Sequence, residues 1–564
     1  MGSEEAVYVR TQTRAVWRDL HGQSRGNPHH LPRQHRDDRT VACHSGLVGR
    51  KRQINRICTM RLLKKIVLGL VVLVLIAAAC VVLMVGPWPL YADSHYQQSG
   101  YFKKALAAID AAVKETHLET TAGPLLAGWA EREITPPIGH PMAGYGTRPN
   151  NKLSTGVLEP LYVRALALND GRDTVVLLGS DMLQTLPNLL AMVEARVSKT
   201  AGLHNRNIMY TSSHTHCGPG GLAPGRLAEE SYGDYHPEYL AFLANRFAEA
   251  IEEAVKTMEP ARFAHGSVDV PEYIRNRTRK GPSDSTLNVA VAEKIEGGRR
   301  LYLARYSAHG TAFGEEMLQL NNDWAGAFQR AVKEKTGSAL LFMGGAVGSM
   351  CPNPPGPPLP KPWTPELEKV FENDVESEMV KQGKKTMDEL LRDQRARVEA
   401  MGAAMAGRLI AAAKDLRFED RVDVASVECF YTPPPAQVRM FSPKWRLSPF
   451  AFKLLGVPTT GRLQAARIGS MFLMGMPYDF SGETSVVWQQ WARERGSDLW
   501  VTSFSGTYLG YLSPDKYYHE IGDGLHYNQN YEIGQMNWFG PNQEAYATEL
   551  FHRVFERMTQ DTPA

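Results

Sequence analysis

The densest group of chemically reactive side chains lies in one short run, Ser212-Ser213-His214-Thr215-His216-Cys217-Gly218-Pro219-Gly220-Gly221. It follows the strand-like run Asn-Ile-Met-Tyr-Thr, so we expect a loop at the end of a strand. Histidines separated by one residue present two imidazoles from alternate positions, and the glycines let backbone or substrate approach closely. Imidazole is the commonest ligand of borderline metals, and zinc needs three or four such groups. An isolated pair of this kind is more often structural, but its setting in a polar loop with a cysteine favours a metal site.

The other candidate metal ligands are scattered along the chain. His309 follows a predicted strand, Asp479 lies in Met-Pro-Tyr-Asp-Phe, and Tyr531 lies in Asn-Gln-Asn-Tyr-Glu. Each has a simpler explanation, because His309 could cap a strand, Asp479 could cap a helix that begins near Ser481, and Tyr531 could pack in a core. Spacing alone does not assemble these residues into one site.

The elements that would position these side chains begin after Gly123-Pro124, where short β-branched strands alternate with helices. Apolar spacing predicts strands over 162–168, 174–178, 207–211, 301–306 and 339–343, and helices over 237–258 and 323–335. The alternation predicts a mixed α/β fold, with one large catalytic domain over 124–564 whose sheets are flanked by helices. Residues 354–400 are expected to be an insertion that is proline-rich at first and then highly charged and helical.

An uninterrupted apolar run, Ile66–Gly86, precedes this domain. As a helix it would be ~31 Å long, which is enough to cross the hydrocarbon core of a bilayer. Basic side chains precede the run and aromatic side chains follow it, namely Arg61, Lys64 and Lys65, then Trp88 and Tyr91. This order predicts a single-pass signal anchor over residues 60–91, with the catalytic domain on the non-cytoplasmic (periplasmic or extracellular) side.

Two other interpretations of the run are a cleaved signal peptide and a lipoprotein signal at Cys80. The run is longer than the apolar part of a usual signal peptide, and the chain stays apolar beyond Cys80, so the anchor is favoured. Residues 1–59 lack periodicity, and we expect a disordered basic tail, a start assigned too far upstream of Met60, or an arm that touches anionic lipid. Residues 92–123 are expected to be a stalk, because 95–117 have the spacing of an amphipathic helix.

The charges and cysteines narrow the class of protein. Residues 1–65 hold 14 Lys and Arg against 5 Asp and Glu, whereas the rest hold 49 against 55, so the catalytic part is mildly acidic and carries no nucleic-acid footprint. The six cysteines are too sparse for a disulfide framework and include no CxxC zinc motif. The fold must therefore be held by its apolar core.

Further motifs occur in a fixed order along the chain. They are AGWAEREITPPIGHPMAGYG, Leu161–Asp170 with Leu178–Asp181, SSHTHCGPGG, Ile274–Thr278, Tyr306–Gly310 followed by Asn321–Asp323, Gly344–Asn353, Met476–Gly482 and Tyr527–Pro541. In this order, from about Ala127 to Tyr546, they resemble the catalytic N-terminal domain of the neutral/alkaline non-lysosomal ceramidases, of which the chain would be a distant member. A single match would be chance, but the ordered series is specific.

The resemblance implies one zinc ion and four ligands. His214 matches the family's first zinc histidine and His309 its second. Asp479 occupies the position of a zinc-binding glutamate, and Tyr531 that of a zinc-binding tyrosine. Because aspartate is one methylene shorter than glutamate, either the backbone moves inward or a water completes the coordination.

The resemblance also implies the catalytic residues. His216 and Arg277 match residues that contact the reacting amide or its oxyanion, and Tyr546 matches one that supplies a further hydrogen bond. Cys351 stands where the family has an active-site serine, and Ser349 where it has an aspartate. For Cys351 three roles stay open, namely a substrate contact (which we favour), a covalent nucleophile and a zinc thiolate, beside the alternative of a small buried thiol without a catalytic role.

Zinc in such a site lowers the pKa of bound water from ~15.7 to about 7 and polarises a carbonyl, while His216 and Arg277 could stabilise the oxyanion. The expected function is therefore hydrolysis of an N-acyl amide bond by a zinc-activated water. The expected substrate is a ceramide-like lipid, which places the enzyme in sphingolipid metabolism at a membrane. The alternatives are a zinc hydrolase for a non-sphingolipid amide or ester, and a catalytically degenerate membrane-anchored binding protein.

Overall fold

The structure, a computed structural model, describes residues 41–88, 94–116, 118, 123–277, 281–356, 375–440, 442–518, 532 and 536–559. The chain divides into two compact units, Met1–Ala78 and Ala79–Ala564. The apolar run belongs to one long helix, α1 (Val41–Met84), whose part Thr59–Met84 has a mean hydropathy of 3.4 and the length to cross a membrane. Helix α1 also includes residues 41–58, for which the sequence predicted no regular structure. Extending an existing helix is far easier than nucleating one, and this segment contains three Arg residues, which accept a helix readily.

The second unit is built on a sheet of eight strands. Their order is β12 (Leu340–Gly344), β10 (Arg300–Tyr306), β9 (Thr286–Lys294), β7 (Glu259–Asp269), β2 (Leu126–Glu133), β4 (Tyr162–Asn169), β5 (Thr174–Ser180) and β6 (Ile208–Ser212). The pairs β10–β12 and β5–β6 are parallel, and the other neighbours are antiparallel. The sheet is therefore mixed, with a parallel pair at each edge.

A second sheet of four strands packs against the first. Its order is β14 (Val424–Tyr431), β17 (Gly461–Ile468), β18 (Met471–Gly475) and β20 (Asp498–Thr502), and only the pair β18–β20 is parallel. Leu177 of β5 and Leu473 of β18 belong to one buried cluster between the two sheets, while their neighbours Leu178 and Met474 belong to the cores on the outer faces. Both faces of each sheet are thus covered, which explains why the central strands read as apolar runs.

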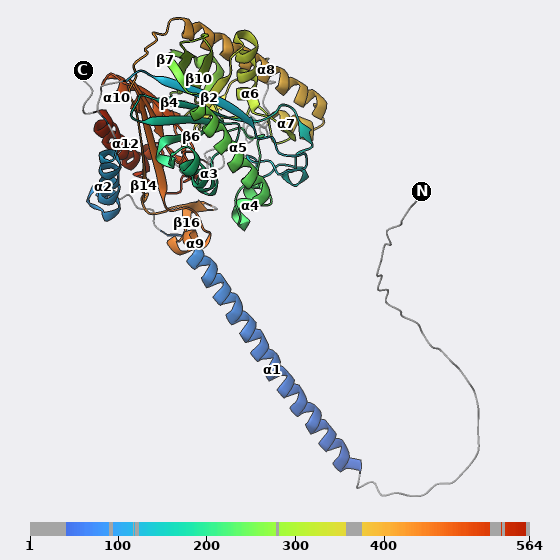
Figure 1. Cartoon of the computed structure of the whole chain (residues 1–564). Helices are drawn as coiled ribbons and strands as arrows, with labels where there is room; N and C mark the ends of the chain where they lie inside the picture. Colours follow the sequence, from blue (N-terminus) through green and yellow to red (C-terminus); the bar gives the residue numbers. More distant parts are fainter. Residues whose placement is uncertain are drawn as a thin grey trace, which may run out of the picture. The chain divides into compact units, whose positions relative to one another are not determined.

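Helices complete the outer layers. Those that share a core with the outer face of the larger sheet are α3 (Pro187–Thr200), α5 (Pro237–Lys256), α6 (Asp323–Thr336) and α8 (Met387–Lys414). Those that share a core with the smaller sheet are α2 (Gly100–Lys114), α10 (Gly482–Arg493) and α12 (Gln543–Thr559). Figure 1 shows α2, α10 and α12 on the side of β14, and α5, α6 and α8 on the other side of the strands. The predicted mixed α/β fold with sheets flanked by helices is confirmed, as four layers in the order helix, sheet, sheet, helix.

The strands and helices predicted from apolar spacing coincide with β4, β5, β6, β10, β12, α5 and α6 to within a few residues. The helix expected as a stalk is α2, and it lies within the folded unit, because Phe102, Ala105, Ile109 and Val113 are buried in the core that it shares with α12. Residues 357–374 of the expected insertion lie outside the described part of the chain. The charged stretch after them supplies α7 (Val375–Lys381) and α8, and α8 packs closely on α6 at Gly402, where a Cβ would lie 2.5 Å from Ala327.

Small pairings carry loops of the second unit. Strand β13 (Met350–Pro352) pairs with β8 (Ile274–Asn276), and β19 (Asp479–Phe480) pairs with β21 (Tyr511–Leu512). A third sheet has the order β1 (Val85–Gly86), β16 (Ser442–Leu447) and β15 (Arg439–Met440). The first two pairings bring loops from different sheets to one place, which is the candidate site.

Candidate metal centre and active site

The candidate site lies at the carboxyl ends of parallel strands. His214 follows β6, His309 follows β10, and Asp479 follows β18, each within a few residues. Carboxyl ends of parallel neighbours such as β18 and β20 meet at one edge of a sheet, where α/β proteins commonly hold ligands. Strands β6 and β10 are not neighbours, and their loops are joined by a bridge between Thr215 and Gly310 and by a hydrogen bond of 3.0 Å from the His216 backbone N–H to the Gly310 carbonyl. His214 has a left-handed backbone with φ of +62°, a conformation that is uncommon for a non-glycine residue and occurs most often at functional sites.

Three imidazoles converge at this edge. The Nε2 atom of His309 lies 2.8 Å from Nε2 of His214 and 2.9 Å from Nε2 of His216, and the last two atoms are 3.4 Å apart. Nδ1 of His214 lies 2.8 Å from the carbonyl oxygen of Leu183, and Nδ1 of His309 lies 3.0 Å from that of Val347. Because a carbonyl only accepts, both Nδ1 atoms donate, which leaves both Nε2 atoms as lone pairs in the neutral rings.

The three rings are held in the neutral form that binds metals. Burial lowers the pKa of His214 to about 3, and it also lowers the pKa values of His216 and His309 well below 6.5. Two buried lone pairs that face each other repel unless a cation lies between them. Tetrahedral zinc with Zn–N bonds of ~2.05 Å would hold two nitrogens about 3.3 Å apart, close to the spacing here. The three histidines could therefore hold a metal ion, whereas the resemblance predicted only His214 and His309 as ligands and His216 as a substrate contact.

Asp479 lies against this cluster. Its Oδ1 atom is 3.5 Å from Nε2 of His214, and this oxygen is buried and accepts no hydrogen bond from the described residues. Burial raises the pKa of Asp479 to about 7, although a hydrogen bond from Tyr508 to Oδ2 at 2.9 Å acts in the opposite direction. An unsatisfied buried carboxylate oxygen beside two nitrogen lone pairs is an arrangement that a cation would satisfy.

Tyr508 is a site residue that the sequence analysis missed. It follows β20, the parallel neighbour of β18, so the rule that places Asp479 at the carboxyl edge places Tyr508 there too. Phe504, in the same loop, stacks on the ring of His214 with 4.1 Å between centroids. The pairing of β18 with β20 was the missing information. Tyr531, the tyrosine that was predicted as a ligand, lies outside the described residues.

Arg277 is fixed beside the cluster by several contacts. Its Nε donates to Glu532 at 2.7 Å, its Nη2 donates to the Gly348 carbonyl at 2.8 Å, and its backbone N–H donates to Ser349. Burial is the main cause of the lowered pKa values of His214 and His309, and the positive charge of Arg277 lowers them further. Glu532 is almost fully buried and was not singled out in the sequence.

His216 packs against the backbone of Ala143-Gly144-Tyr145-Gly146, the end of the first ceramidase-like motif. Gly144 has φ of +105°, and a Cβ at this position would lie 2.6 Å from Cγ of His216. Only glycine allows this approach.

Cys351 and Tyr546 have different surroundings. Cys351 is a buried thiol in β13, opposite Arg275 of β8, in the strand pair that leads to Arg277. Tyr546 lies in α12, where its hydroxyl donates to the Thr432 carbonyl at 2.8 Å and its ring packs against Phe102 of α2. Cys351 therefore lies in a strand near the site, whereas Tyr546 packs in the core that α12 shares with α2.

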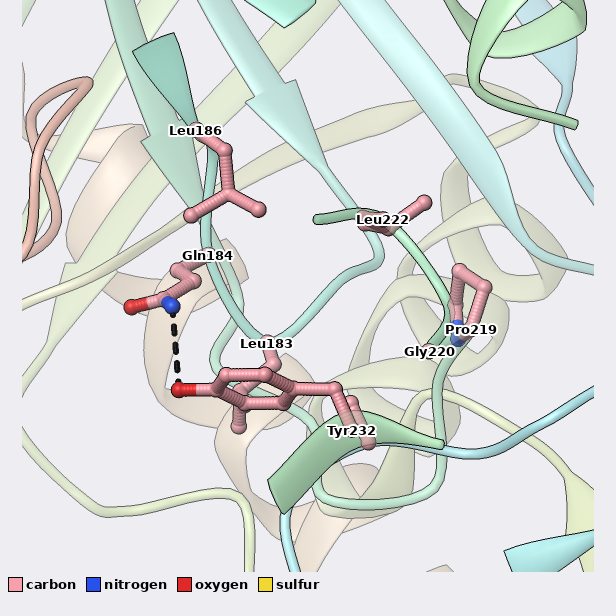
Figure 2. A pocket seen from close by; sticks show the side chains of 8 residues that line it. Leu183, Gln184, Leu186, Pro219, Gly220, Leu222 and Tyr232 are labelled. Atoms are coloured by element: carbon pink, nitrogen blue, oxygen red, sulfur yellow. Dashed lines mark hydrogen bonds between the residues drawn. The ribbon is translucent and has the colours of Figure 1, made fainter. Parts of the chain in front are cut away.

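An apolar pocket adjoins the metal centre. Figure 2 shows its lining, in which Leu183, Leu186 and Leu222 surround the hydrogen bond of 3.2 Å from Gln184 to the Tyr232 hydroxyl. Leu183 joins the two features, because its side chain lines the pocket and its carbonyl accepts from His214. An apolar group could thus lie next to the three histidines.

Comparisons with known proteins agree with this geometry. Residues 125–283 match the family model of the neutral/alkaline non-lysosomal ceramidase, N-terminal. The fold is similar to that of neutral ceramidases. It is similar to the crystal structure of neutral ceramidase from Pseudomonas aeruginosa, with a TM-score of 0.59, 17% identity, and coverage of 78% of this chain and 75% of that one. It is also similar to a ceramidase complexed with C2, with a TM-score of 0.60, 17% identity, and coverage of 78% and 76%. No curated protein matches the chain in sequence.

The resemblance stated from the motifs is therefore confirmed over residues 125–283, and the ceramidase fold extends it over most of the chain. The matched range contains His214, His216 and Arg277, whereas His309 and Asp479 lie beyond it. In the folded structure, His309 and Asp479 lie next to His214 of the matched range.

Proposed function

We propose that this protein is a membrane-anchored, zinc-dependent amide hydrolase that acts on an N-acyl lipid of the ceramide type. The observation that carries the proposal is the convergence of three neutral, buried imidazoles and one unsatisfied buried carboxylate oxygen on a single point. His214, His309 and Asp479 would hold the zinc ion. Tyr531 remains the predicted fourth ligand, and Tyr508 is the tyrosine that the described contacts place beside Asp479.

When bound, zinc supplies an activated water at neutral pH and polarises the amide carbonyl. The chain's own residues orient the reactants. The carbonyls of Leu183 and Val347 fix the ring positions of His214 and His309 through their Nδ1 atoms. Arg277, held by Glu532 and Gly348, places a fixed positive charge where an oxyanion develops, and His216 offers a neutral imidazole on the same side.

Two features support a lipid substrate. The small hollow beside His214 has apolar walls formed by Leu183, Leu186 and Leu222, which favour an apolar group over a charged one next to the site. The apolar helix Thr59–Met84 would keep the enzyme at a membrane, where such substrates are concentrated.

The test compares metal content and hydrolysis in one set of variants of the full chain. Purified protein should hold about one zinc per chain and cleave at least one member of a panel of N-acyl lipids, with loss of activity in a chelator. His214→Ala and His309→Ala should each lose both metal and hydrolysis. His265→Ala is the matched control, because this histidine contacts Asp498 and Ser470 instead of the cluster. Full zinc and activity in His309→Ala would overturn the ligand assignment.

The substrate panel separates the alternatives. Cleavage of soluble amides or esters in preference to N-acyl lipids would assign a non-sphingolipid substrate. If the protein holds no zinc after incubation with added zinc, it would be assigned as a catalytically degenerate binding protein.

We further propose that α1 anchors the second unit on the non-cytoplasmic side. The support is the order of basic, apolar and aromatic residues around Ile66–Gly86. Protease added to sealed cells should remove the second unit. Its complete protection would overturn this topology.

A further inference from the structure

A small apolar patch lies on the surface of the second unit, around the short helix α9 (Pro449–Leu454). We define the α9 patch as Trp445, Phe450, Leu454 and Leu455, which are 36%, 68%, 65% and 45% exposed. Figure 1 shows α9 beside β16.

The helix itself is firmly held. The Ser448 hydroxyl accepts from the Ala451 backbone N–H and caps the helix, and Ala451 and Phe452 are buried in the core on the smaller sheet. The helix therefore buries one apolar face and exposes another, whereas the outer face of a helix in contact with water is normally polar.

The apolar run enters the second unit at the same place. The Met84 carbonyl, at the end of α1, accepts from the backbone N–H of Ser448 at 2.9 Å. Val85 and Gly86 pair with Leu447 and Arg446 in the antiparallel ladder β1–β16. Met84, the last residue of α1, is thus one hydrogen bond away from Ser448, the N-cap of α9.

We infer that the α9 patch is a second membrane contact, inserted into the interface of the bilayer from which the apolar run emerges. A run that crosses a bilayer ends at its surface, and β1 ties that end to β16 and α9. Trp and Phe favour the interface, Leu favours the acyl boundary, and the exposed Lys453 between them suits lipid phosphate. The inference rests on the anchoring part of the proposed function and is independent of hydrolysis.

A second copy of the chain is a poorer occupant for the patch. A stable interface buries about 800 Å² on each partner, across some 20 to 30 residues. The α9 patch offers four apolar side chains, which are too few for such an interface but enough for an interfacial contact that the covalent anchor already makes local.

The experiment maps lipid contacts on the full chain. The protein is reconstituted into phosphatidylcholine vesicles that contain a lipid with a diazirine on its acyl chain, irradiated, and digested for mass spectrometry. Adducts are expected in 445–455 as well as in 66–86. Val487 of α10 is 63% exposed, so its peptide is a matched control that should carry none. Adducts in 66–86 without any in 445–455 would overturn the inference, as would equal labelling of the Val487 peptide.

Variants make the result specific. Phe450→Ser with Leu454→Ser should lower adducts in 445–455 at least fivefold, whereas Val487→Ser with Ile295→Ser, which removes equally exposed side chains, should change nothing. Zinc content and hydrolysis of a short-chain substrate, measured in the same samples, report separately on the proposed function. A particle of twice the mass, in which 445–455 carries no lipid adduct, would assign the patch to a second copy and overturn the inference.

Discussion

The buried pair of Arg277 and Glu532 allows the catalytic and structural roles of one arginine to be separated. Their side chains are 15% and 2% exposed, with 2.7 Å between Nε and the carboxylate. Arg277→Gln leaves the Glu532 carboxylate without this cation, and breaking one partner of a buried pair costs about 3–5 kcal/mol. If Arg277 also stabilises the oxyanion, its loss should lower kcat by about 10²–10³-fold, which corresponds to 2.7–4 kcal/mol.

The two effects are resolved by a cycle of three variants, Arg277→Gln, Glu532→Gln and both together. The double variant removes the uncompensated charge, so we expect its thermal unfolding temperature to recover most of the loss seen with Arg277→Gln. Its kcat should stay as low as that of Arg277→Gln, with zinc content equal to that of the parent. Recovery of kcat together with stability would show that Arg277 only holds the fold, and would refute its assignment to the oxyanion.

Three further substitutions test single contacts. Cys351→Ser should keep substantial kcat/KM on N-acyl substrates, because a hydroxyl replaces the thiol as a hydrogen-bonding group, and collapse with zinc retained and a trapped acyl thioester would make Cys351 the nucleophile. Tyr508→Phe removes the donor to Asp479, so competition with a chelator should show zinc binding weakened about 10–100-fold, and unchanged affinity would make this contact irrelevant to the metal. Burial lowers the pKa of His140 to about 4, so below pH 6.5 the folded protein binds fewer protons than the unfolded chain. The free energy of unfolding should therefore fall by about 2 kcal/mol between pH 7 and pH 5 because of this residue. His140→Gln, which keeps a donor to the Gly220 carbonyl, should remove that share of the loss in unfolding measured at both pH values, and an unchanged pH dependence would contradict it.

The sequence predicted the parts of the fold that have a strong local signal. The strands β4, β5 and β10 and the helices α5 and α6 have clear apolar spacing. The second sheet was not predicted, because β18 has only five residues, and β17 carries the buried polar side chains Arg462, Gln464 and Arg467, which interrupt its apolar pattern. The amphipathic pattern of α2 predicted a helix, yet it could not name α12 as the element that covers its apolar face.

The same limit applies to the site. The His-x-His loop could be recognised from the sequence because a single residue separates its two histidines. Neither spacing nor composition joins them to Asp479 or to Tyr508, whose position depends on the parallel pairing of β18 with β20. Family motifs supplied His309 and Asp479, and the structure supplied Tyr508 and Glu532.

The distance along the chain between the site residues has a consequence for how the protein folds. His214 and His309 are 95 residues apart in sequence, and Asp479 comes from the other sheet. Contacts between such distant segments require the closure of long loops and form slowly. Leu473 and Trp500, in the cluster between the sheets, must be in place before Asp479 can reach His214. We expect the three histidines to gather only in the last stage of refolding, so the recovery of metal binding should lag behind the recovery of helical circular dichroism.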